Sequence, residues 1–435
     1  MPDQYDVLIV GGGQAGPPLA RDLAKAGKRV ALAERKYRGG SCINFGCTPT
    51  KAAIASARLA HLARRAVDFG LRIPQVEVDF PAVLRRASAI ALQFRTGLDK
   101  SFENSDNPKL LRGHARFLGP GFKLQVGSTQ VLAKQVVLNT GTRTAIPKIA
   151  GLEKVAYIHS GNWLEHAELP QRLAMIGGSY IGLEMAQFYR RMGSQVTVWE
   201  GSPRIAVHED EEVSTAIRQF LEREGIEFRV NAHIQSIDQL SASHVFLGTG
   251  RTPNTDDLGL ETVGVETSPR GFVKIDQRLA TNVPGIWAAG DIRGGPMFTH
   301  TSWDDYRILL SQISGDGSRT TERIVPYAMF TDPELGRVGL TEQDAREKGL
   351  KFSVSRFEMK RNGKANEIGE PDGFIKVLLE EGTRKILGAA VLAAEGAELV
   401  HLFIDIMNAR ASSTVIRDAI HIHPTLAEAV QSAVT

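Results

Sequence analysis

Residues 5–16 read YDVLIVGGGQAG, and this stretch decides the fold. A short apolar run that ends in glycines is typical of a buried parallel strand. A helix is expected next at about 14–27, followed by a second strand, RVALAE, at 29–34. Between the first strand and the helix stands the pattern GxGxxG, formed by Gly11, Gly13 and Gly16. Strand, glycine turn, helix and strand in this order predict a βαβ unit that binds a dinucleotide.

The glycines and the acid of such a unit each have a role in binding the dinucleotide or in packing the helix on the strand. Gly11 makes the tight turn, Gly13 lets the backbone approach a pyrophosphate, and Gly16 lets the helix pack closely on the strand. The N-terminus of the helix then faces the phosphates. Glu34, at the end of the second strand, can accept hydrogen bonds from both ribose hydroxyls.

The same pattern returns in the middle of the chain. RLAMIGG (172–178) is expected to form a strand, a helix follows at about 180–192, and QVTVWE (195–200) is the next strand. The second glycine turn contains Gly177, Ser179 and Gly182, and the unit ends in the acid Glu200. The spacing from the first glycine to the acid equals that in the first unit. This internal repeat predicts two dinucleotide-binding domains.

Glu200 also bears on the choice of nicotinamide cofactor. A carboxylate at this position favours a free 2′-hydroxyl and repels a 2′-phosphate, so NADH is expected. Arg204 lies close in the sequence and could hold a 2′-phosphate, so NADPH remains the alternative. Ser179 replaces the middle glycine, which predicts a slightly looser approach of the pyrophosphate.

The two cysteines of the chain lie together in GGSCINFGCTPTK, as Cys42 and Cys47. Two cysteines five positions apart indicate a reactive pair or half of a metal site. No second cluster of Cys or His has the spacing that would complete a metal site, so no metal is expected. An alanine-rich helix is expected from about Cys47, and a helix N-terminus stabilises a thiolate. One thiol of the pair is therefore predicted to be a ready thiolate.

A third motif, HIHPTLAE (421–428), lies near the C-terminus. His423 precedes a proline at an expected helix start, and Glu428 lies on the first turns of that helix. A histidine held by a carboxylate is the usual acid/base unit of thiol chemistry. Taken alone, such a pair is more often structural.

Composition limits the class of protein. The 435 residues suffice for two to four domains, and the net charge of +3 without a basic block does not suggest a nucleic-acid surface. No apolar run is long enough to span a membrane. The N-terminus has no secretory signal pattern, so a soluble cytoplasmic protein is expected. Strands and then helices after about residue 320 predict an α+β C-terminal domain.

Together these motifs resemble those of the pyridine nucleotide–disulfide oxidoreductases, such as glutathione reductase, dihydrolipoamide dehydrogenase and mercuric reductase. The resemblance covers essentially the whole chain and rests on GGGQAG, GGSCINFGCTPTK, NTGT, GGSYIGLE, GTGRTPN, AAGD and HIHPTLAE. It implies an FAD-binding domain at 1–145 and 255–320, an NAD(P)H-binding domain at 146–254 and a dimerisation domain at 321–435. The implied fold is α/β, with two Rossmann-like domains and a C-terminal α+β domain.

The resemblance also implies a role for each matching residue. Cys47 would lie against the flavin, and Cys42 would attack the substrate. Lys51 and Glu184 would pair near flavin N5, and Tyr180 would cover the nicotinamide pocket. In such a homodimer, His423 and Glu428 would serve the disulfide of the other subunit. The further expected cofactor contacts are Gly40, Ser41, Thr140, Gly141, Gly250, Arg251, Gly290 and Asp291.

The substrate stays open, because three functions fit these motifs. The first is an NAD(P)H-dependent oxidoreductase of a small-molecule disulfide or dithiol, which the pair His423 and Glu428 favours. The second is reduction of Hg(II) or Cu(II), favoured by likeness of GGGQAGPPLA and FTHTSWDDYRI to the mercuric-reductase-like branch. The C-terminal cysteine pair of the mercury enzymes has no counterpart in VQSAVT. The third is a redox-sensing binding module. The stretch between Gln235 and His244 is also shorter than in relatives, which affects the nicotinamide domain.

Overall fold

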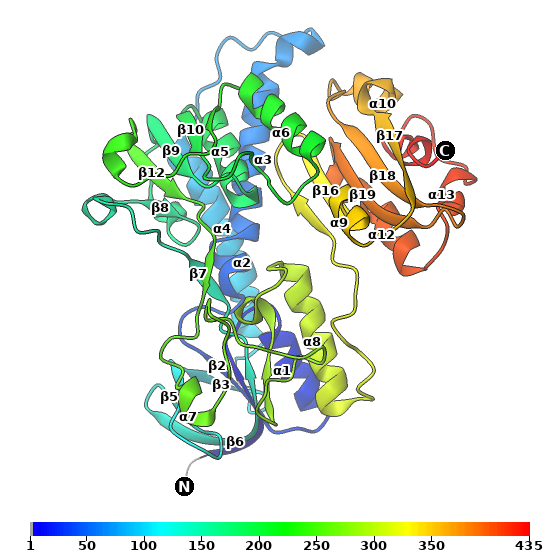
Figure 1. Cartoon of the computed structure of the whole chain (residues 1–435). Coiled ribbons are helices and arrows are strands. Elements are labelled where there is room, and N and C mark those ends of the chain that lie inside the picture. Colours follow the sequence, from blue (N-terminus) through cyan, green and yellow to red (C-terminus); the bar gives the residue numbers. More distant parts are fainter. Residues whose placement is uncertain (1–2, 104) are drawn as a thin grey trace.

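The computed structural model describes residues 3–103 and 105–435. Figure 1 shows three lobes: the N-terminal sheet at the bottom, a second sheet at the upper left and the C-terminal sheet at the right. Two long helices, α3 (Cys47–Arg64) and α4 (Phe80–Lys100), run upward from the first lobe to the second. The expected fold class, two Rossmann-like units followed by an α+β dimerisation domain, is confirmed.

The N-terminal lobe is built on a mixed sheet of the order β3-β2-β1-β6-β5-β4, with β14 paired to β6. Its parallel centre places Val7 beside Val30 on one side and beside Gln135 on the other. The apolar run of β1 is almost entirely buried, as expected for a strand covered on both faces. The elements are β1 (Asp3–Val10), α1 (Gly16–Lys25), β2 (Val30–Glu34), β3 (Lys109–Arg112), β4 (Ala115–Phe117), β5 (Lys123–Val126), β6 (Thr129–Leu138), α7 (Leu260–Val263), β14 (Ile286–Ala288) and α8 (Thr299–Ser314).

The second lobe repeats this plan with a parallel sheet of the order β11-β10-β9-β12-β8. A two-stranded ribbon, β7 with β13, connects it to the first lobe. The shorter stretch before His244 holds one 3-10 turn, Ile237–Gln239. The elements are β7 (Thr142–Thr144), β8 (Ile158–His159), β9 (Arg172–Ile176), α5 (Tyr180–Met192), β10 (Gln195–Trp199), α6 (Glu211–Arg223), β11 (Glu227–Arg229), β12 (His244–Leu247) and β13 (Arg251–Pro253).

The C-terminal lobe has an antiparallel sheet of the order β15-β16-β19-β18-β17, and the helices that follow β19 pack on one face of it. Strands β18 and β19 are buried almost throughout and form the centre of its core. The elements are β15 (Tyr327–Met329), β16 (Glu334–Gly339), α9 (Glu342–Glu347), β17 (Phe352–Glu358), α10 (Gly363–Glu367), β18 (Phe374–Glu380), β19 (Ile386–Ala393), α11 (Gly396–Leu399), α12 (His401–Asn408), α13 (Thr414–Arg417) and α14 (Ala427–Ser432).

One hydrophobic core joins α3 and α4 to the second and third lobes. Ala53 and Ala57 of α3 are almost fully buried in it, and alanine allows α3 to approach α5 closely. Phe188 of α5 and Leu392 of β19 belong to the same core. The helix that begins at Cys47 is therefore fixed by packing against the second lobe.

Candidate active site

The two cysteines lie on consecutive helices. Cys42 belongs to the short helix α2 (Gly40–Asn44), which the sequence pattern did not predict, and Cys47 is the first residue of α3. Gly39 precedes α2 with a φ of 91°, a left-handed conformation that glycine adopts without strain. Both cysteines are free thiols in this structure. Their side chains contact each other through a hydrogen bond.

The surroundings of the pair separate the two thiols electrostatically. The hydrogen bond from Cys42, that of Thr299 and the charge of Lys51 lower the pKa of Cys47 to about 6. The same hydrogen bond, together with burial, raises the pKa of Cys42 above its ordinary value. The reduced pair therefore carries one thiolate, on Cys47, while Cys42 holds the remaining proton.

Thr299 is a site residue that the motif analysis missed. It opens α8, and its Oγ1 lies 3.3 Å from Cys47 Sγ. Because a thiolate can only accept, the threonine hydroxyl donates in the thiolate state. The two residues are far apart in sequence, and a lone threonine carries no pattern, so only the fold brings them together.

Lys51 and Glu184, predicted as an ion pair, meet across two lobes. Lys51 Nζ lies 2.7 Å from Glu184 Oε2. The other oxygen of Glu184, Oε1, accepts the backbone N–H of Phe330 at 2.8 Å. The ammonium group also lies 4.6 Å from the centre of the Phe330 ring. Glu184, which is almost fully buried, thus ties α3 to the C-terminal lobe.

Tyr180 is the first residue of α5 and lies close to a buried charge pair. Burial, and then the carboxylate of Asp291, raise the pKa of its phenol to about 12. Burial also raises the pKa of Asp291, although Arg251 opposes this. Thr142 connects the pair: its hydroxyl donates to Asp291 at 3.1 Å and accepts from Arg251 at 3.0 Å.

The glycine turn of the first unit leaves room only for backbone. A Cβ on Gly11 would lie 2.3 Å from the Asn139 carbonyl oxygen, and one on Gly16 would lie 2.4 Å from that of Gly11. Gly40, with a φ of 61°, approaches the Gly13 Cα so that a Cβ would lie 3.0 Å from it. The turn thus presents bare backbone at the start of α1, as a pyrophosphate site requires.

The acids that end the two units make equivalent hydrogen bonds to the backbone. Glu34 Oε2 accepts the N–H of Gly12 at 2.7 Å, and Glu200 Oε2 accepts that of Gly178 at 2.7 Å. In each case the second oxygen accepts an N–H two residues further on. Both carboxylates are therefore fixed at the ends of their strands. The internal repeat thus extends to individual hydrogen bonds.

A cavity of about 440 Å³ lies beside the second glycine turn. Gly177, Ser179 and Glu200 line it, together with the ring of Trp199 and the open Gly250. A Cβ on Gly177 would lie 2.4 Å from Gly248 O, so this turn is also made of close backbone. The cavity has the size and the lining of a nucleotide site.

Arg204 points away from this cavity. Its guanidinium donates to the backbone carbonyl oxygens of Ala206, Val207 and Glu209, at 3.4, 2.9 and 2.7 Å. It is absent from the cavity lining. An arginine committed to carbonyls in this way has few free N–H groups for a phosphate.

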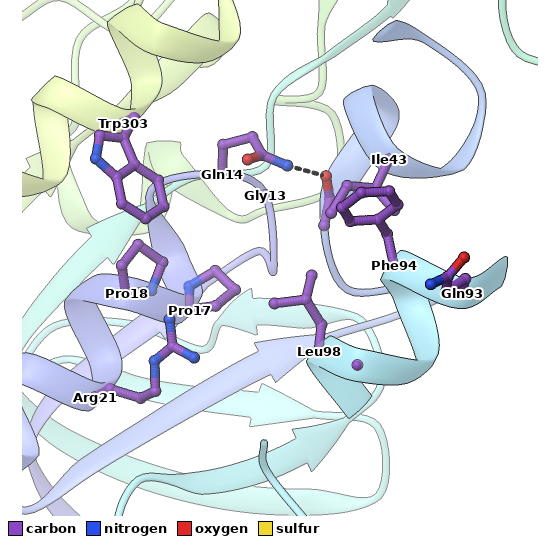
Figure 2. Close-up of a pocket in the computed structure, with 12 residues that line it drawn as sticks. Gly13, Gln14, Pro17, Pro18, Arg21, Ile43, Gln93, Phe94, Leu98 and Trp303 are labelled. Atoms are coloured by element: carbon purple, nitrogen blue, oxygen red, sulfur yellow. Dashed lines mark hydrogen bonds between the residues drawn. The ribbon is translucent and has the colours of Figure 1, made fainter. Parts of the chain in front are cut away.

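A second cavity, of about 470 Å³, opens between α1, α2, α4 and α8. Figure 2 shows the rings of Trp303, Phe94, Pro17 and Pro18 around it, with Arg21 at one side. Gln14 closes one wall by donating to Gly39 O at 2.8 Å. Ile43, the neighbour of Cys42 on α2, belongs to the lining. The cavity is thus largely apolar and adjoins the helix that carries Cys42.

His423 and Glu428 form the predicted pair, but away from the cysteines of their own chain. His423 Nδ1 lies 3.0 Å from Glu428 Oε1, and Glu428 Oε2 accepts the N–H of Thr425 at 2.9 Å. The Thr425 N–H and then His423 lower the pKa of Glu428. The imidazole is 77% exposed. Figure 1 shows the end of the chain on the outer side of the C-terminal sheet, whereas α2 lies near the centre.

The remaining predicted contacts lie around the same centre. Thr140 is occupied within the protein, because its hydroxyl donates to Asn254 O at 2.7 Å. Ser41 is exposed at the start of α2, and Gly141 has open space around it. Gly290 donates its N–H to the buried Asp305 at 2.8 Å.

Within 3–103 and 105–435, no group of three His, Cys, Asp or Glu side chains is arranged to hold a metal ion. None of the helices described is long and apolar enough to cross a membrane.

Two repeated nucleotide sites, a polarised cysteine pair and a third antiparallel lobe define a two-dinucleotide thiol oxidoreductase. The model of the family "Pyridine nucleotide-disulphide oxidoreductase" matches residues 5–305, and that of its dimerisation domain matches residues 325–434. The chain belongs to this family. It is a flavoprotein disulfide oxidoreductase with a dimerisation domain, and the family's cofactors are FAD and a pyridine nucleotide.

Individual relatives match over nearly their whole length. The probable pyridine nucleotide-disulfide oxidoreductase RclA of Escherichia coli is 32% identical, over 98% of both chains. A dihydrolipoyl dehydrogenase of Cupriavidus necator is 31% identical, over 100% of this chain and 98% of its own. The solved structure of RclA in a Cu(II) complex covers 99% of both chains, at 30% identity, with a TM-score of 0.91.

Proposed function

We propose that this protein is an NADH-dependent reductase of small-molecule disulfides, acting through Cys42 and Cys47. The single observation that carries the proposal is the polarised thiol pair at the head of α3. There Cys47 is the thiolate, and Cys42 keeps its proton. Such a division suits one sulfur that faces a cofactor and one that exchanges with a substrate.

The residues present fit an FAD. The bare backbone at Gly11, Gly13 and Gly40 would hold the pyrophosphate, and Glu34 the ribose of the adenosine half. Asp291, held by Thr142, would receive a hydroxyl of the ribityl chain. When bound, FAD accepts a hydride and passes two electrons to a disulfide. We assign the FAD-binding domain to 1–145 and 255–320, the NADH-binding domain to 146–254 and the dimerisation domain to 321–435.

The geometry at the second unit supports NADH over NADPH. The carboxylate of Glu200 is fixed by the N–H groups of Gly178 and Ser202, where the hydroxyls of a ribose would bind. A 2′-phosphate would meet this negative charge. Arg204 would not offset it, because its guanidinium binds three carbonyl oxygens.

Lys51, Glu184 and Tyr180 serve the nicotinamide side of the centre. The ion pair fixes a positive charge where a flavin would be reduced, and this charge also favours the thiolate of Cys47. Tyr180 covers the approach at the start of α5 and would move when NADH binds.

The thiol steps begin with the proton of Cys42. His423 of a second copy of the chain takes this proton, and the Cys42 thiolate attacks one sulfur of the substrate disulfide, so that a mixed disulfide forms and one substrate thiolate leaves. His423 then gives the proton to that leaving thiolate, and Glu428 fixes its ring. Cys47 Sγ then attacks Cys42 Sγ, which releases the second substrate thiol and restores the Cys42–Cys47 disulfide.

The apolar cavity next to α2 supports a substrate with an apolar part. The rings of Trp303 and Phe94 are exposed, and covering exposed aromatic side chains with a ligand is favourable. Arg21 is the cation at its edge and would attract a negatively charged group. The cavity thus favours small disulfides with an apolar chain and one anionic end.

Reduction of a metal ion is the second candidate. It is favoured by the solved Cu(II) complexes of RclA, because that protein matches this chain over nearly its whole length. Two thiols can bind a soft ion directly. Within the described part of this chain, however, no further Cys, His, Asp or Glu side chain is placed to bind a metal ion together with the two cysteines.

The test is anaerobic titration of the purified flavoenzyme with NADH and, separately, NADPH. We expect reduction at lower concentrations of NADH, and a long-wavelength charge-transfer band that Cys47→Ser abolishes. Steady-state oxidation of NADH is then measured with lipoamide, glutathione disulfide, Cu(II) and Hg(II). Turnover of a disulfide that Cys42→Ser and His423→Ala both impair supports the proposal. Turnover of metal ions alone, indifferent to His423→Ala, favours the second candidate.

A further inference from the structure

Phe298 immediately precedes the residue that contacts Cys47, and it links two lobes. Its ring stacks on that of Tyr327, with the centres 5.5 Å apart and the planes 4° from parallel. On the same segment, His300 stacks on Phe298 at 5.3 Å, and its Nε2–H donates to Pro326 O at 2.7 Å. Two contacts therefore join the start of α8, in the first lobe, to the start of β15, in the third.

Tyr327 is itself anchored in buried charge. Its hydroxyl hydrogen-bonds the carboxylate of Glu209, which is 6% exposed. Arg337, 1% exposed, lies 3.7 Å from another oxygen of that carboxylate. These contacts restrict the movement of Tyr327, and through the stacking they also restrict the ring of Phe298.

Tyr180 closes the third side of Phe298. The two rings lie 5.9 Å apart, with their planes tilted by 42°. Phe298 is therefore held by aromatic rings of the second and third lobes. The hydroxyl oxygen of the next residue, Thr299, lies 3.3 Å from the sulfur of Cys47.

We infer that Tyr327, acting through Phe298, is a positioning residue that holds the Thr299 hydroxyl against the sulfur of Cys47. The inference rests on the proposed role of Cys47 as the thiolate of the reduced enzyme. A hydroxyl stabilises a thiolate only when distance and direction are kept, so the frame that fixes Thr299 sets how strongly it acts. The dimerisation domain would in this way tune the thiol pair of its own chain.

The test measures the pKa of Cys47 by the pH dependence of iodoacetamide alkylation. The flavoenzyme is reduced with dithiothreitol, and peptide mass spectrometry separates Cys42 from Cys47. Thr299→Val removes the hydroxyl and keeps the shape. We expect it to raise the pKa of Cys47 by about one pH unit, slowing alkylation at pH 6 about five-fold.

Thr301→Val is the matched control on the same helix. The hydroxyl of Thr301 is buried and has no hydrogen-bond partner among the described residues, so its removal leaves the site intact. We expect wild-type alkylation from this variant. If Thr299→Val behaved in the same way as Thr301→Val, the role of the Thr299 hydroxyl would be refuted.

A pair of variants at Tyr327 isolates the ring stack. Tyr327→Phe and Tyr327→Leu both lose the hydrogen bond to Glu209, but only the first keeps the ring. We expect an increase of about half a pH unit in the pKa of Cys47 in the Leu variant, and a smaller increase in the Phe variant, which loses the anchoring hydrogen bond but keeps the ring. Equal values in the two variants would overturn the positioning role. Because alkylation needs neither NADH nor substrate, a failure of the proposed reductase function would be seen separately, as wild-type enzyme that NADH does not reduce.

Discussion

Glu334, the first residue of β16, carries a carboxyl group in an unfavourable place. Burial, and then the charges of Glu395 and Asp332, raise its pKa to about 7. The N–H of Ala397, which donates to the carboxylate at 3.0 Å, lowers the pKa and offsets part of this rise. In the unfolded chain the group has its ordinary pKa of 4.5. Between these values the folded protein holds a proton that the unfolded chain releases. Stability therefore falls as pH rises from 4.5 to 7 and stays reduced above.

Glu334→Gln removes this ionisation and keeps an oxygen for the Ala397 N–H. We expect the variant to be more stable than wild type at pH 8, by about 2 kcal/mol in the free energy of unfolding, and equal to it at pH 4.5. Urea unfolding followed by fluorescence at the two pH values checks this. A difference that is the same at both pH values would mean that packing, and not ionisation, separates the two proteins.

Residues that belong to motifs could be predicted from the sequence, whereas residues that only the fold unites could not. Lys51 and Glu184 were predicted as a pair and lie 2.7 Å apart, and His423 lies against Glu428 as expected. Their proposed roles in catalysis stay predictions. Thr299 stayed hidden because a threonine at a helix start has many ordinary uses.

At the scale of elements, a buried cluster of charges joins the segment before α6 to the C-terminal sheet. Lys376 of β18 is 1% exposed, and its Nζ lies 3.2 Å from Asp210, with Glu212 and Glu342 also paired to it. Arg337 of β16 lies 3.7 Å from Asp210. Removing one partner from such a cluster leaves the other charges buried without compensation.

Lys376→Met should therefore lower the free energy of unfolding by about 3 kcal/mol. Lys274→Met is the control, since Lys274 pairs with Glu266 at 3.0 Å but on the surface. We expect it to cost less than about 1 kcal/mol. Differential scanning calorimetry compares the two variants. Equal melting temperatures would show that the charge cluster does not stabilise the contact between the second lobe and the C-terminal sheet.

The repeated elements were predictable because their signals are local. Strand, glycine turn and acid fall within about 30 residues in each unit, and the structure puts β1, α1 and β2 within a few residues of the expected bounds. Short helices could not be predicted in this way. Helix α2 has five residues, fewer than two turns, and no periodicity can identify so short a helix. The helical segment after β19 is likewise divided into two short helices, α11 and α12.

For the whole molecule, the exposed apolar side chains near the end of the chain bear on assembly. Ile420 is fully exposed and Ile422 is 79% exposed, on either side of His421 and next to His423. Val415 and Leu402 add further exposed apolar surface to the same domain. The family's dimerisation domain covers this region, so burial by a second copy accounts for side chains that are costly to leave in water.

Ile420→Glu should weaken the dimer, because a carboxylate would be buried in the interface. Leu118→Glu is the control, because Leu118 is exposed in the N-terminal lobe, outside the dimerisation domain. This variant should stay dimeric. Sedimentation velocity over a range of concentrations separates the outcomes. We expect the Ile420 variant to dissociate and to lose disulfide turnover while its flavin is still reduced by NADH. A dimer as tight as wild type would place Ile420 outside the interface.

The sharing of a site between two subunits has its own test. Cys47→Ser and His423→Ala each disable every site of their own homodimer if His423 serves the cysteine pair of the other chain. In a dimer of one chain of each kind, one site pairs an intact Cys47 with an intact His423, and the other lacks both. Random reassociation of equal amounts should therefore restore about one quarter of the wild-type activity, because half of the dimers are mixed and each has one complete site. If His423 served its own chain instead, each site in every dimer would lack one of the two residues. Mixing would then restore no activity, although both variants would still dimerise.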